Sequence, residues 1–285
     1  MKRNFLFSAL FAITVLLSLP SCTSSKPTQV EETESQQEIK LGGSSSTYAA
    51  IKLLSDAYTS QNPKLKVSVL PKSQSGGGIA GIKAGLVDVV GVSRKLKPSE
   101  DDGSVVYKEL ARDGLVVATH SSVKGVKNLT TSQLKAIYSG AIANWRELGG
   151  PNAEIIVLDR PEDESGKRLL REHYLGKELK NAPKVVIMRY EPELINALQN
   201  TPYSIGAFSL AYAISNKLPV NRLSLNNIEA IPENIKSGKY KMVRHIGIVK
   251  VKKSSEVTQK FLDFVFSDKG AKILNSSGFV SSVPK

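Results

Sequence analysis

From residue 39 to the end of the chain, short apolar runs rich in β-branched residues alternate with stretches of helical periodicity. The first three runs are Ile39–Gly43, Leu65–Leu70 and Val87–Val92, and amphipathic segments separate them. Parallel strands need a long crossover, usually a helix, whereas antiparallel strands can be joined by a short turn. This order therefore predicts a largely parallel sheet covered by helices, which is the α/β class.

The same pattern begins again after a strand at Leu115–Thr119. Later strands are expected at Glu154–Leu158, Val185–Met188, Ser204–Phe208 and Ile246–Val251, and helices after Thr130, Ser165, Pro192 and residue 251. Roughly 245 residues follow the N-terminal segments, which is long for one compact domain and enough for two cores. We expect two α/β lobes, lobe 1 from residues 39–118 and 245–285 and lobe 2 from residues 119–244.

The N-terminus has the composition of an export signal. A positive start, Met1–Arg3, precedes the mostly apolar run Phe5–Leu19, which is shorter than the roughly 20 residues that span a bilayer. The sequence Leu-Pro-Ser-Cys that ends at Cys22 resembles a bacterial lipobox. We expect residues 1–21 to be a signal peptide and Cys22 to carry lipid. The alternative is an ordinary signal peptide followed by a chance cysteine.

Residues 23–38 consist almost entirely of Ser, Thr, Gln, Glu, Lys and Pro. Such a segment cannot bury enough apolar surface to offset its ordering entropy, so we expect a flexible tether. Cys22 is the only cysteine, which excludes internal disulfides and leaves stability to the apolar cores.

The formal net charge is +13, and removal of Lys2 and Arg3 with the signal would leave about +11. A basic chain can attract nucleic acid, a membrane surface or small anions. The basic residues are scattered singly and are not interleaved with aromatic residues on one face, so we expect no nucleic-acid partner.

Three loops share the order strand, then Ser or Gly, then helix: Gly43–Thr47, Ser75–Gly78 and Ser165–Arg168. The start of a helix offers unpaired backbone N–H groups and a positive dipole end, so it attracts anions. Serine adds a hydroxyl donor, and glycine lets the backbone approach a ligand. Each loop alone could be ordinary helix capping, with Ser45 or Ser46 as the cap of the first helix. Together they predict an anion site at the carboxyl ends of the strands.

Two arginines stand beside these loops. Arg94 ends the strand after the glycine loop, and Arg160 ends the strand before Ser165. A guanidinium group binds phosphate oxygens in pairs, which favours a role in anion binding. The alternative for each is a surface salt bridge.

Several segments resemble the phosphate-binding proteins of ABC importers. The resemblance is carried by SQSGGGIAGIKAGLVDVVGVSRKL, by LTTSQLKAIYSGAIANWRELGG, by Arg160 with Ser165-Gly166, and by Ser204–Phe208. It runs from about residue 40 to the end, in the family's order. The resemblance implies a type II periplasmic binding protein fold, in which two α/β lobes with mixed sheets are joined by a two-strand hinge and hold one dehydrated oxyanion.

By motif position, the resemblance assigns phosphate binding to Ser45, Ser46, Ser75, Ser93, Arg94, Arg160, Ser165, Gly166 and Lys167. Two positions depart from the family pattern. Many members have threonine where this chain has Lys167, and some have an aspartate, which accepts the proton of hydrogen phosphate, where this chain has Arg94. Asp159, Asp163 or Glu164 could supply such an acceptor from lobe 2, so the choice between phosphate and sulfate stays open.

The resemblance implies a solute-binding protein that delivers phosphate to an ABC permease, and the lipobox adds the expectation of a lipid anchor at the cell envelope. We expect a monomer without metal or cofactor. The alternatives are a binding protein for sulfate, molybdate or tungstate, and a lipoprotein that senses phosphate or acts as a scaffold.

A phosphatase-like hydrolase is a further alternative. Its usual signals are missing, because the three histidines are dispersed without metal-ligand spacing and the chain has no Gly-x-Ser-x-Gly motif. Ser165-Gly166-Lys167 also lacks the upstream glycine of a P-loop. We therefore expect no catalysis.

Overall fold

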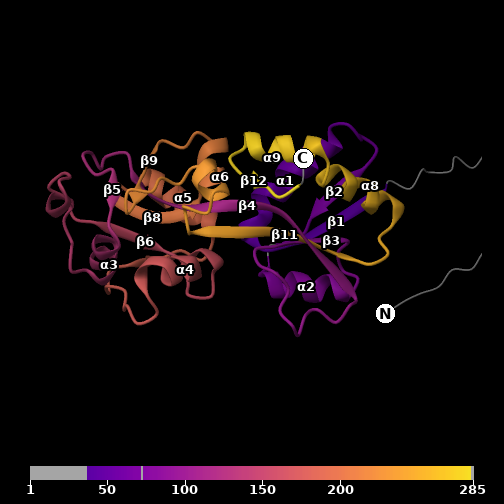
Figure 1. Ribbon diagram of the computed structural model, residues 1–285, viewed down its shortest axis with the longest axis horizontal. Coiled ribbons are helices and arrows are strands. Elements are labelled where there is room, and N and C mark those ends of the chain that lie inside the picture. Colours follow the sequence, from indigo (N-terminus) through magenta and orange to yellow (C-terminus); the bar gives the residue numbers. More distant parts are fainter. Residues whose placement is uncertain (1–36, 72, 284–285) are drawn as a thin grey trace, which may run out of the picture. The chain divides into compact units, whose positions relative to one another are not determined.

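The computed structural model describes residues 37–71 and 73–283, all of which belong to one compact unit (Figure 1). The predicted signal peptide, the lipidation site at Cys22 and most of the predicted tether lie outside the described residues. Within the described ranges, no helix has both the length and the apolar character that a membrane crossing requires.

Ten strands of the described chain form one mixed sheet, in the order β2-β1-β3-β11-β4-β8-β6-β7, and β12 and β9 pair with β4. Their bounds are β1 (Glu38–Gly43), β2 (Lys66–Val69), β3 (Val89–Val92), β4 (Val105–His120), β6 (Ile156–Asp159), β7 (Val186–Ile187), β8 (Ser204–Ser209), β9 (Val220–Arg222), β11 (Val243–Val251) and β12 (Val280–Ser281). The short strands β5 (Asn128–Leu129) and β10 (Ser224–Leu225) pair separately.

Parallel pairing is confined to the two ends of the sheet. At one end β1 pairs with β2 and β3 in parallel, and at the other end β6 pairs with β7 and β8 in parallel. In the middle, β4 and β11 run antiparallel to each other and to their neighbours. The predicted parallel pattern is therefore correct for both ends and wrong for the middle.

Strand β4 passes through both halves of the sheet. Its first part pairs with β11, and residues 115–119 pair with β8. The sequence analysis predicted only this second part, because polar residues interrupt the first part, in which Lys108 and Glu109 stand beside the buried Leu110. In Figure 1, β4 and β11 run between the two ends of the sheet.

Helices cover the sheet, and most begin near the predicted positions. They are α1 (Tyr48–Thr59), α2 (Ser75–Lys83), α3 (Thr131–Ser139), α4 (Ser165–Leu170), α5 (Glu191–Asn200), α6 (Leu210–Ser215), α7 (Pro232–Lys236), α8 (Glu256–Val265) and α9 (Asp268–Ser276). One prediction was wrong in detail: Ser45 and Ser46 do not cap the first helix, because both lie in a 3-10 turn before α1, and Ser44 caps that turn.

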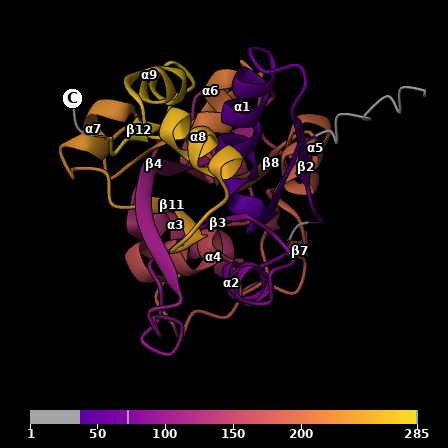
Figure 2. The same cartoon turned by 90° about the vertical axis from the view of Figure 1, so that its right-hand side faces the viewer.

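The β1–β3 end of the sheet, which we call lobe 1, is covered on both faces. Neighbouring residues of a strand point to opposite faces. Accordingly, Val89 packs with α1, α8 and α9, whereas Val90 packs with α2. Figure 2 shows α1, α8 and α9 on one side of these strands and α2 on the other.

The β6–β8 end, which we call lobe 2, has a separate core that includes Trp145 and Tyr138. On β4, Ala111 belongs to the lobe 1 core and Leu115 to the lobe 2 core. On β11, Ile246 belongs to the lobe 1 core, and Met242, just before the strand, belongs to the lobe 2 core. Residues 115–118, which the sequence analysis assigned to lobe 1, belong to the lobe 2 core.

A buried ion cluster stands where the two central strands leave one lobe for the other. Arg244 on β11 lies directly opposite Asp113 on β4, and its Nη2 is 2.8 Å from Asp113 Oδ2. Arg244 Nη1 is also 2.6 Å from Glu191 Oε2 at the start of α5. Burial alone would lower the pKa of Arg244, but Glu191 and Asp113 outweigh it, so the pKa is raised and the guanidinium stays charged.

Arg244→Met should therefore lower the free energy of unfolding by about 3–5 kcal/mol, because it leaves two buried carboxylates without their cation. Denaturation in urea measures this difference. The control is Lys260→Met, which removes an exposed pair with Glu256 and should leave the free energy of unfolding nearly unchanged. Equal effects of the two substitutions would contradict a structural role for the cluster.

Candidate functional site

A cavity of about 520 Å³ lies between lobe 1 and lobe 2. Its lining residues are Ser44, Ser45, Ser73, Gln74, Ser75, Gly76, Gly77, Ser93, Arg94, Lys97, Glu100, Asp163, Glu164, Ser165 and Arg168. All three predicted Ser/Gly loops contribute to this set. Of the nine residues assigned to anion binding by motif, the cavity wall contains Ser45, Ser75, Ser93, Arg94 and Ser165.

The first loop connects β1 to α1 through a short 3-10 turn, Ser45–Thr47. Ser44 caps this turn, since its Oγ accepts a hydrogen bond from the Ser46 backbone N–H at 3.3 Å. Gly43 before it has φ +122°, and a Cβ there would lie 2.1 Å from the carbonyl oxygen of Gly91. Only glycine lets the chain turn this close to β3, which directs the serines toward the cavity.

The second loop is the start of α2. Ser75 Oγ accepts a hydrogen bond from the Ser93 backbone N–H at 3.1 Å and lies 3.4 Å from Ser93 Oγ. Ser93 Oγ is in turn 3.5 Å from Ser44 Oγ. Three hydroxyls from three different elements therefore gather at the carboxyl ends of β1 and β3.

The third loop is the start of α4, in lobe 2. Ser165 Oγ lies 3.1 Å from Ser46 Oγ, so the third loop meets the first loop across the two lobes. Gln74 is at the N-cap position of α2, and Glu164 is at the N-cap position of α4. Neither side chain accepts a hydrogen bond from the first turn of its helix. The first-turn N–H groups of both helices thus remain donors for another partner.

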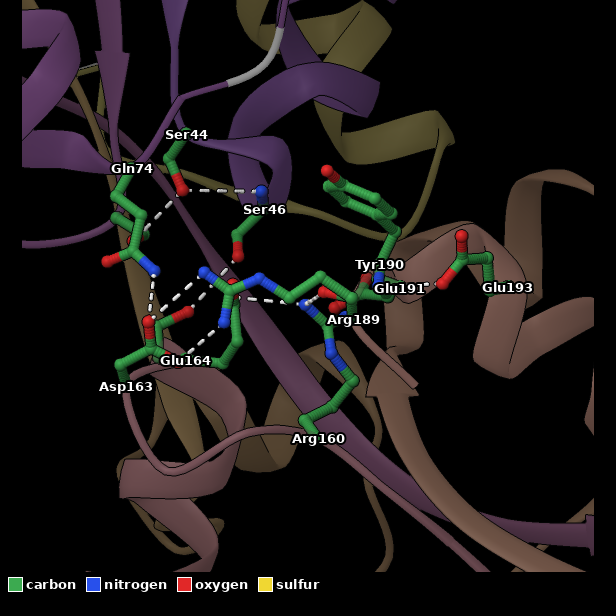
Figure 3. A network of polar contacts seen from close by, with 12 residues as sticks. Ser44, Ser46, Gln74, Arg160, Asp163, Glu164, Arg189, Tyr190, Glu191 and Glu193 are labelled. Carbon is green, nitrogen blue, oxygen red and sulfur yellow. Dashed lines mark hydrogen bonds and ion pairs between the residues drawn. The ribbon is translucent and has the colours of Figure 1, made fainter. Parts of the chain in front are cut away.

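Arg160 is buried and belongs to a network of polar contacts that reaches Glu164 at the cavity wall (Figure 3). Its Nη2 is 3.0 Å from the carbonyl oxygen of Arg189 and 3.1 Å from Glu164 Oε2. Its Nε has no hydrogen-bond partner among the described residues. Burial lowers the pKa of Arg160, and the charges of Glu191 and Glu164 oppose that effect. Arg160 is thus a buried cation with one donor, Nε, that has no partner among the described residues.

Arg94 lines the cavity, but its guanidinium is already paired. Nη1 and Nη2 lie 2.6 and 2.7 Å from the two carboxylate oxygens of Glu100, and Nη1 also donates to the carbonyl of Lys95. The hydrogen bonds from Arg94 to the carboxylate are the main reason why the pKa of Glu100 is lowered to about 2. The pair is therefore ionised at neutral pH, and the salt bridge weighed as the alternative for Arg94 is present.

The side chain of Lys167 turns away from the cavity into lobe 2. Its Nζ forms an ion pair with Asp159, lies 3.4 Å from Asn181 Oδ1 and stands 5.2 Å from the centre of the Tyr138 ring. The ammonium group is fully buried there. A direct role of this ammonium group in anion binding does not fit the structure, and only the backbone N–H of Lys167 remains at the start of α4.

Because Asp159 is paired with Lys167 inside lobe 2, it is not at the cavity, although it was one of the three carboxylates considered as acceptors of the hydrogen phosphate proton. The other two, Asp163 and Glu164, line the cavity. Gly166, also assigned by motif, is buried in the first turn of α4 next to Ser165.

Sequence reasoning assigned no individual binding role to several lining residues, among them Gln74, Lys97, Glu100 and Arg168. Arg168 could have been found, since it follows Ser165 by three residues and positions three apart share one face of a helix. Lys97 and Glu100 belong to the segment after β3, which carries no periodic signal. Within the described ranges, no group of three or more His, Cys, Asp or Glu residues could hold a metal ion.

A match to a family model shows to which protein family this chain belongs. A family model described as a PBP superfamily domain matches residues 28–269, which is most of the sequence. The chain belongs to the PBP superfamily. The type II periplasmic binding protein fold expected from the sequence is confirmed by this match and by the structural neighbours.

Relatives of this PBP superfamily member include proteins named phosphate-binding protein PstS. The one from Borreliella burgdorferi is 28% identical over 256 residues, covering 87% of this chain and 91% of the relative. The one from Bacillus subtilis is 24% identical over 293 residues, covering 98% and 95%. The expected resemblance to the phosphate-binding proteins of ABC importers is thereby confirmed.

Solved structures of similar proteins agree with this relationship. A putative phosphate ABC transporter substrate-binding protein with bound phosphate from Clostridium perfringens has a TM-score of 0.75 and 26% identity, covering 86% of this PBP chain and 99% of the neighbour. PstS from Borrelia burgdorferi has a TM-score of 0.55 and 26% identity, covering 86% and 98%.

Lys167→Met should lower the free energy of unfolding by about 3–5 kcal/mol, because Asp159 would be left buried without its cation. Urea denaturation measures the loss. Adding Asp159→Leu should restore much of the stability, since no buried charge then remains. A single substitution without effect would contradict the pairing of Lys167 with Asp159.

Glu100→Gln should lower the free energy of unfolding by about 1 kcal/mol at pH 7, because the ion pair is only partly buried. The folded-state pKa of Glu100 lies below its usual value of 4.5, so the ionised carboxylate contributes stability above that pH. The contribution is lost as the pH falls toward 2, and the unfolding curves of the variant and the native protein should converge there. A difference that grows as the pH falls would contradict this assignment.

Proposed function

We propose that this protein captures inorganic phosphate between its two lobes and presents it to the membrane permease of an ABC importer. The observation that carries the proposal is the meeting of three helix starts at one cavity. Ser46 and Ser165 bring the loops of the two lobes to a 3.1 Å contact, and Ser44, Ser75 and Ser93 gather beside them.

The donors at this place suit a small oxyanion. The first turns of α2 and α4 offer backbone N–H groups and the positive ends of their dipoles. Arg160 adds a buried guanidinium with an unpaired Nε. Hydrogen bonds to a charged ligand contribute about 1.5–3 kcal/mol each, so several of them, less the costs of desolvation and closure, support binding in the micromolar range or tighter.

Two features favour phosphate among the oxyanions. Hydrogen phosphate carries an O–H donor that sulfate lacks, and the carboxylates of Asp163 and Glu164 at the cavity wall can accept it. The names of the relatives and the phosphate bound in the Clostridium perfringens structure support the same ligand. Sulfate, molybdate and tungstate remain the ligands against which selectivity is to be measured.

A non-catalytic role is part of the proposal. The cavity wall contains no histidine among the described residues: His120 pairs with Ser122, His245 pairs with Glu109, and His173 lies 4.0 Å from Glu172. We also propose that the protein acts as a monomer, needs no cofactor, and is held at the cell envelope by a lipid on Cys22. The predicted lipobox is the support for that anchor.

Calorimetric titration of the full chain carrying Cys22→Ser should give one phosphate site per chain. Arg160→Ala should weaken binding about 100-fold, because it removes the buried cation next to the anion. The matched control is Arg222→Ala on β9, an exposed arginine outside the cavity wall, which should change the dissociation constant less than about twofold.

Absence of heat with phosphate, sulfate, molybdate and tungstate would refute the proposed function. Hydrolysis of a chromogenic phosphate ester that disappears on Ser165→Ala would instead indicate a hydrolase.

A further inference from the structure

A second contact between the lobes lies at the cavity wall, outside the serine cluster. Gln74 Nε2 of lobe 1 donates a hydrogen bond of 2.9 Å to Asp163 Oδ2 of lobe 2 (Figure 3). Asp163 is held in turn by the fork of Arg189, with distances of 3.1 and 3.2 Å to its two oxygens. We call these three residues the clasp.

The clasp joins the two helix starts that face the cavity. Gln74 is the residue before α2, and Asp163 stands two residues before the first residue of α4, Ser165. A contact at this place fixes the position of the first turn of α2 relative to the first turn of α4. Because Gln74 belongs to lobe 1 and Asp163 to lobe 2, the contact exists only while the two lobes are close together.

Arg189 connects the clasp to the buried guanidinium. Its side chain binds Asp163, and its carbonyl oxygen accepts a 3.0 Å hydrogen bond from Arg160 Nη2. Hydrogen bonds from Arg189 are the main reason why the pKa of Asp163 lies below its usual value, so the carboxylate stays charged at neutral pH. Unlike Gln74 and Asp163, Arg189 is not part of the cavity wall.

We propose that the clasp sets the rate at which bound phosphate is released, with Arg189 as its positioning residue. This inference rests on the proposed function. Two strands, β4 and β11, connect the lobes, and two-strand connections of this kind permit hinge opening. Phosphate can leave only when the two lobes open. Contacts that form only in the closed state therefore slow the release of phosphate and leave its association rate unchanged.

The clasp is exposed to solvent, which limits its strength. Gln74, Asp163 and Arg189 are all exposed side chains, and contacts of this kind contribute little each. A loss of the clasp should therefore speed release by about two- to fivefold and leave the association rate within about twofold.

Stopped-flow measurement of phosphate association and release tests the proposal on Gln74→Ala, Arg189→Ala and the double variant. Each single variant should release phosphate about two- to fivefold faster, and the double variant no faster than the stronger single one, because both residues act through Asp163. The control is Lys184→Ala, which removes an exposed pair with Glu154 inside lobe 2 and should leave release unchanged.

Gln74→Glu replaces the attraction between residues 74 and 163 by repulsion. It places a second carboxylate against Asp163, so release should be faster than in Gln74→Ala, and added salt should reduce that excess. A direct contact of Gln74 with the ligand predicts otherwise: Arg189→Ala would then leave release unchanged. That result, or fully additive effects in the double variant, would overturn the proposal.

A measurement without ligand separates the clasp from the proposed function. Dyes on Lys177→Cys and Glu256→Cys, in the full chain with Cys22→Ser, report the distance between the lobes by energy transfer. The fraction of closed molecules should fall in Gln74→Ala and Arg189→Ala but not in Lys184→Ala. If the native protein bound no oxyanion, the proposed function would be wrong. If the closed fraction were unchanged in Gln74→Ala and Arg189→Ala, the role proposed for the clasp would be wrong.

Discussion

The fold depends on the ion cluster formed by Arg244, Asp113 and Glu191. Only β4 and β11 carry the described chain through the middle of the sheet, and Arg244 and Asp113 face each other there in direct register. A one-residue slip would turn these buried charges toward apolar surroundings, at a cost of several kcal/mol. Because Glu191 begins α5, the same guanidinium also fixes lobe 2 to the strand pair. The cluster thus determines where one lobe ends and the other begins.

The site is built from backbone donors that the fold leaves without partners. Helices α2 and α4 begin without a side-chain cap, which is unfavourable for an isolated helix and useful next to an anion. The carboxylates around the cavity each have an arginine: Glu100 has Arg94, Glu164 has Arg160, and Asp163 has Arg189. In the proposed function, attraction for an anion therefore comes from helix starts, hydroxyls and the guanidinium of Arg160, and less from an excess of charged side chains.

Much of the site could be predicted from local sequence. The Ser and Gly residues at the starts of α2 and α4 have a defined local role, so their position at the cavity followed from strand-then-helix order. Arg94 and Lys167 were harder. Both are cations beside a Ser/Gly loop, yet Arg94 binds Glu100 and Lys167 binds Asp159. The choice of partner depends on where another segment places a carboxylate, and no local pattern encodes that distance.

By itself, the sequence determined the α/β class, the order of the longer strands and helices, the helix starts that face the cavity and many of the apolar core positions. These follow from periodicity and residue type, which act within a few residues. Tertiary structure alone decided that β4 continues through both lobes and that Gln74 meets Asp163 across them. It also decided that the ammonium group of Lys167 turns into the core. Such features depend on contacts between distant segments, where burial and charge pairing outweigh local preference.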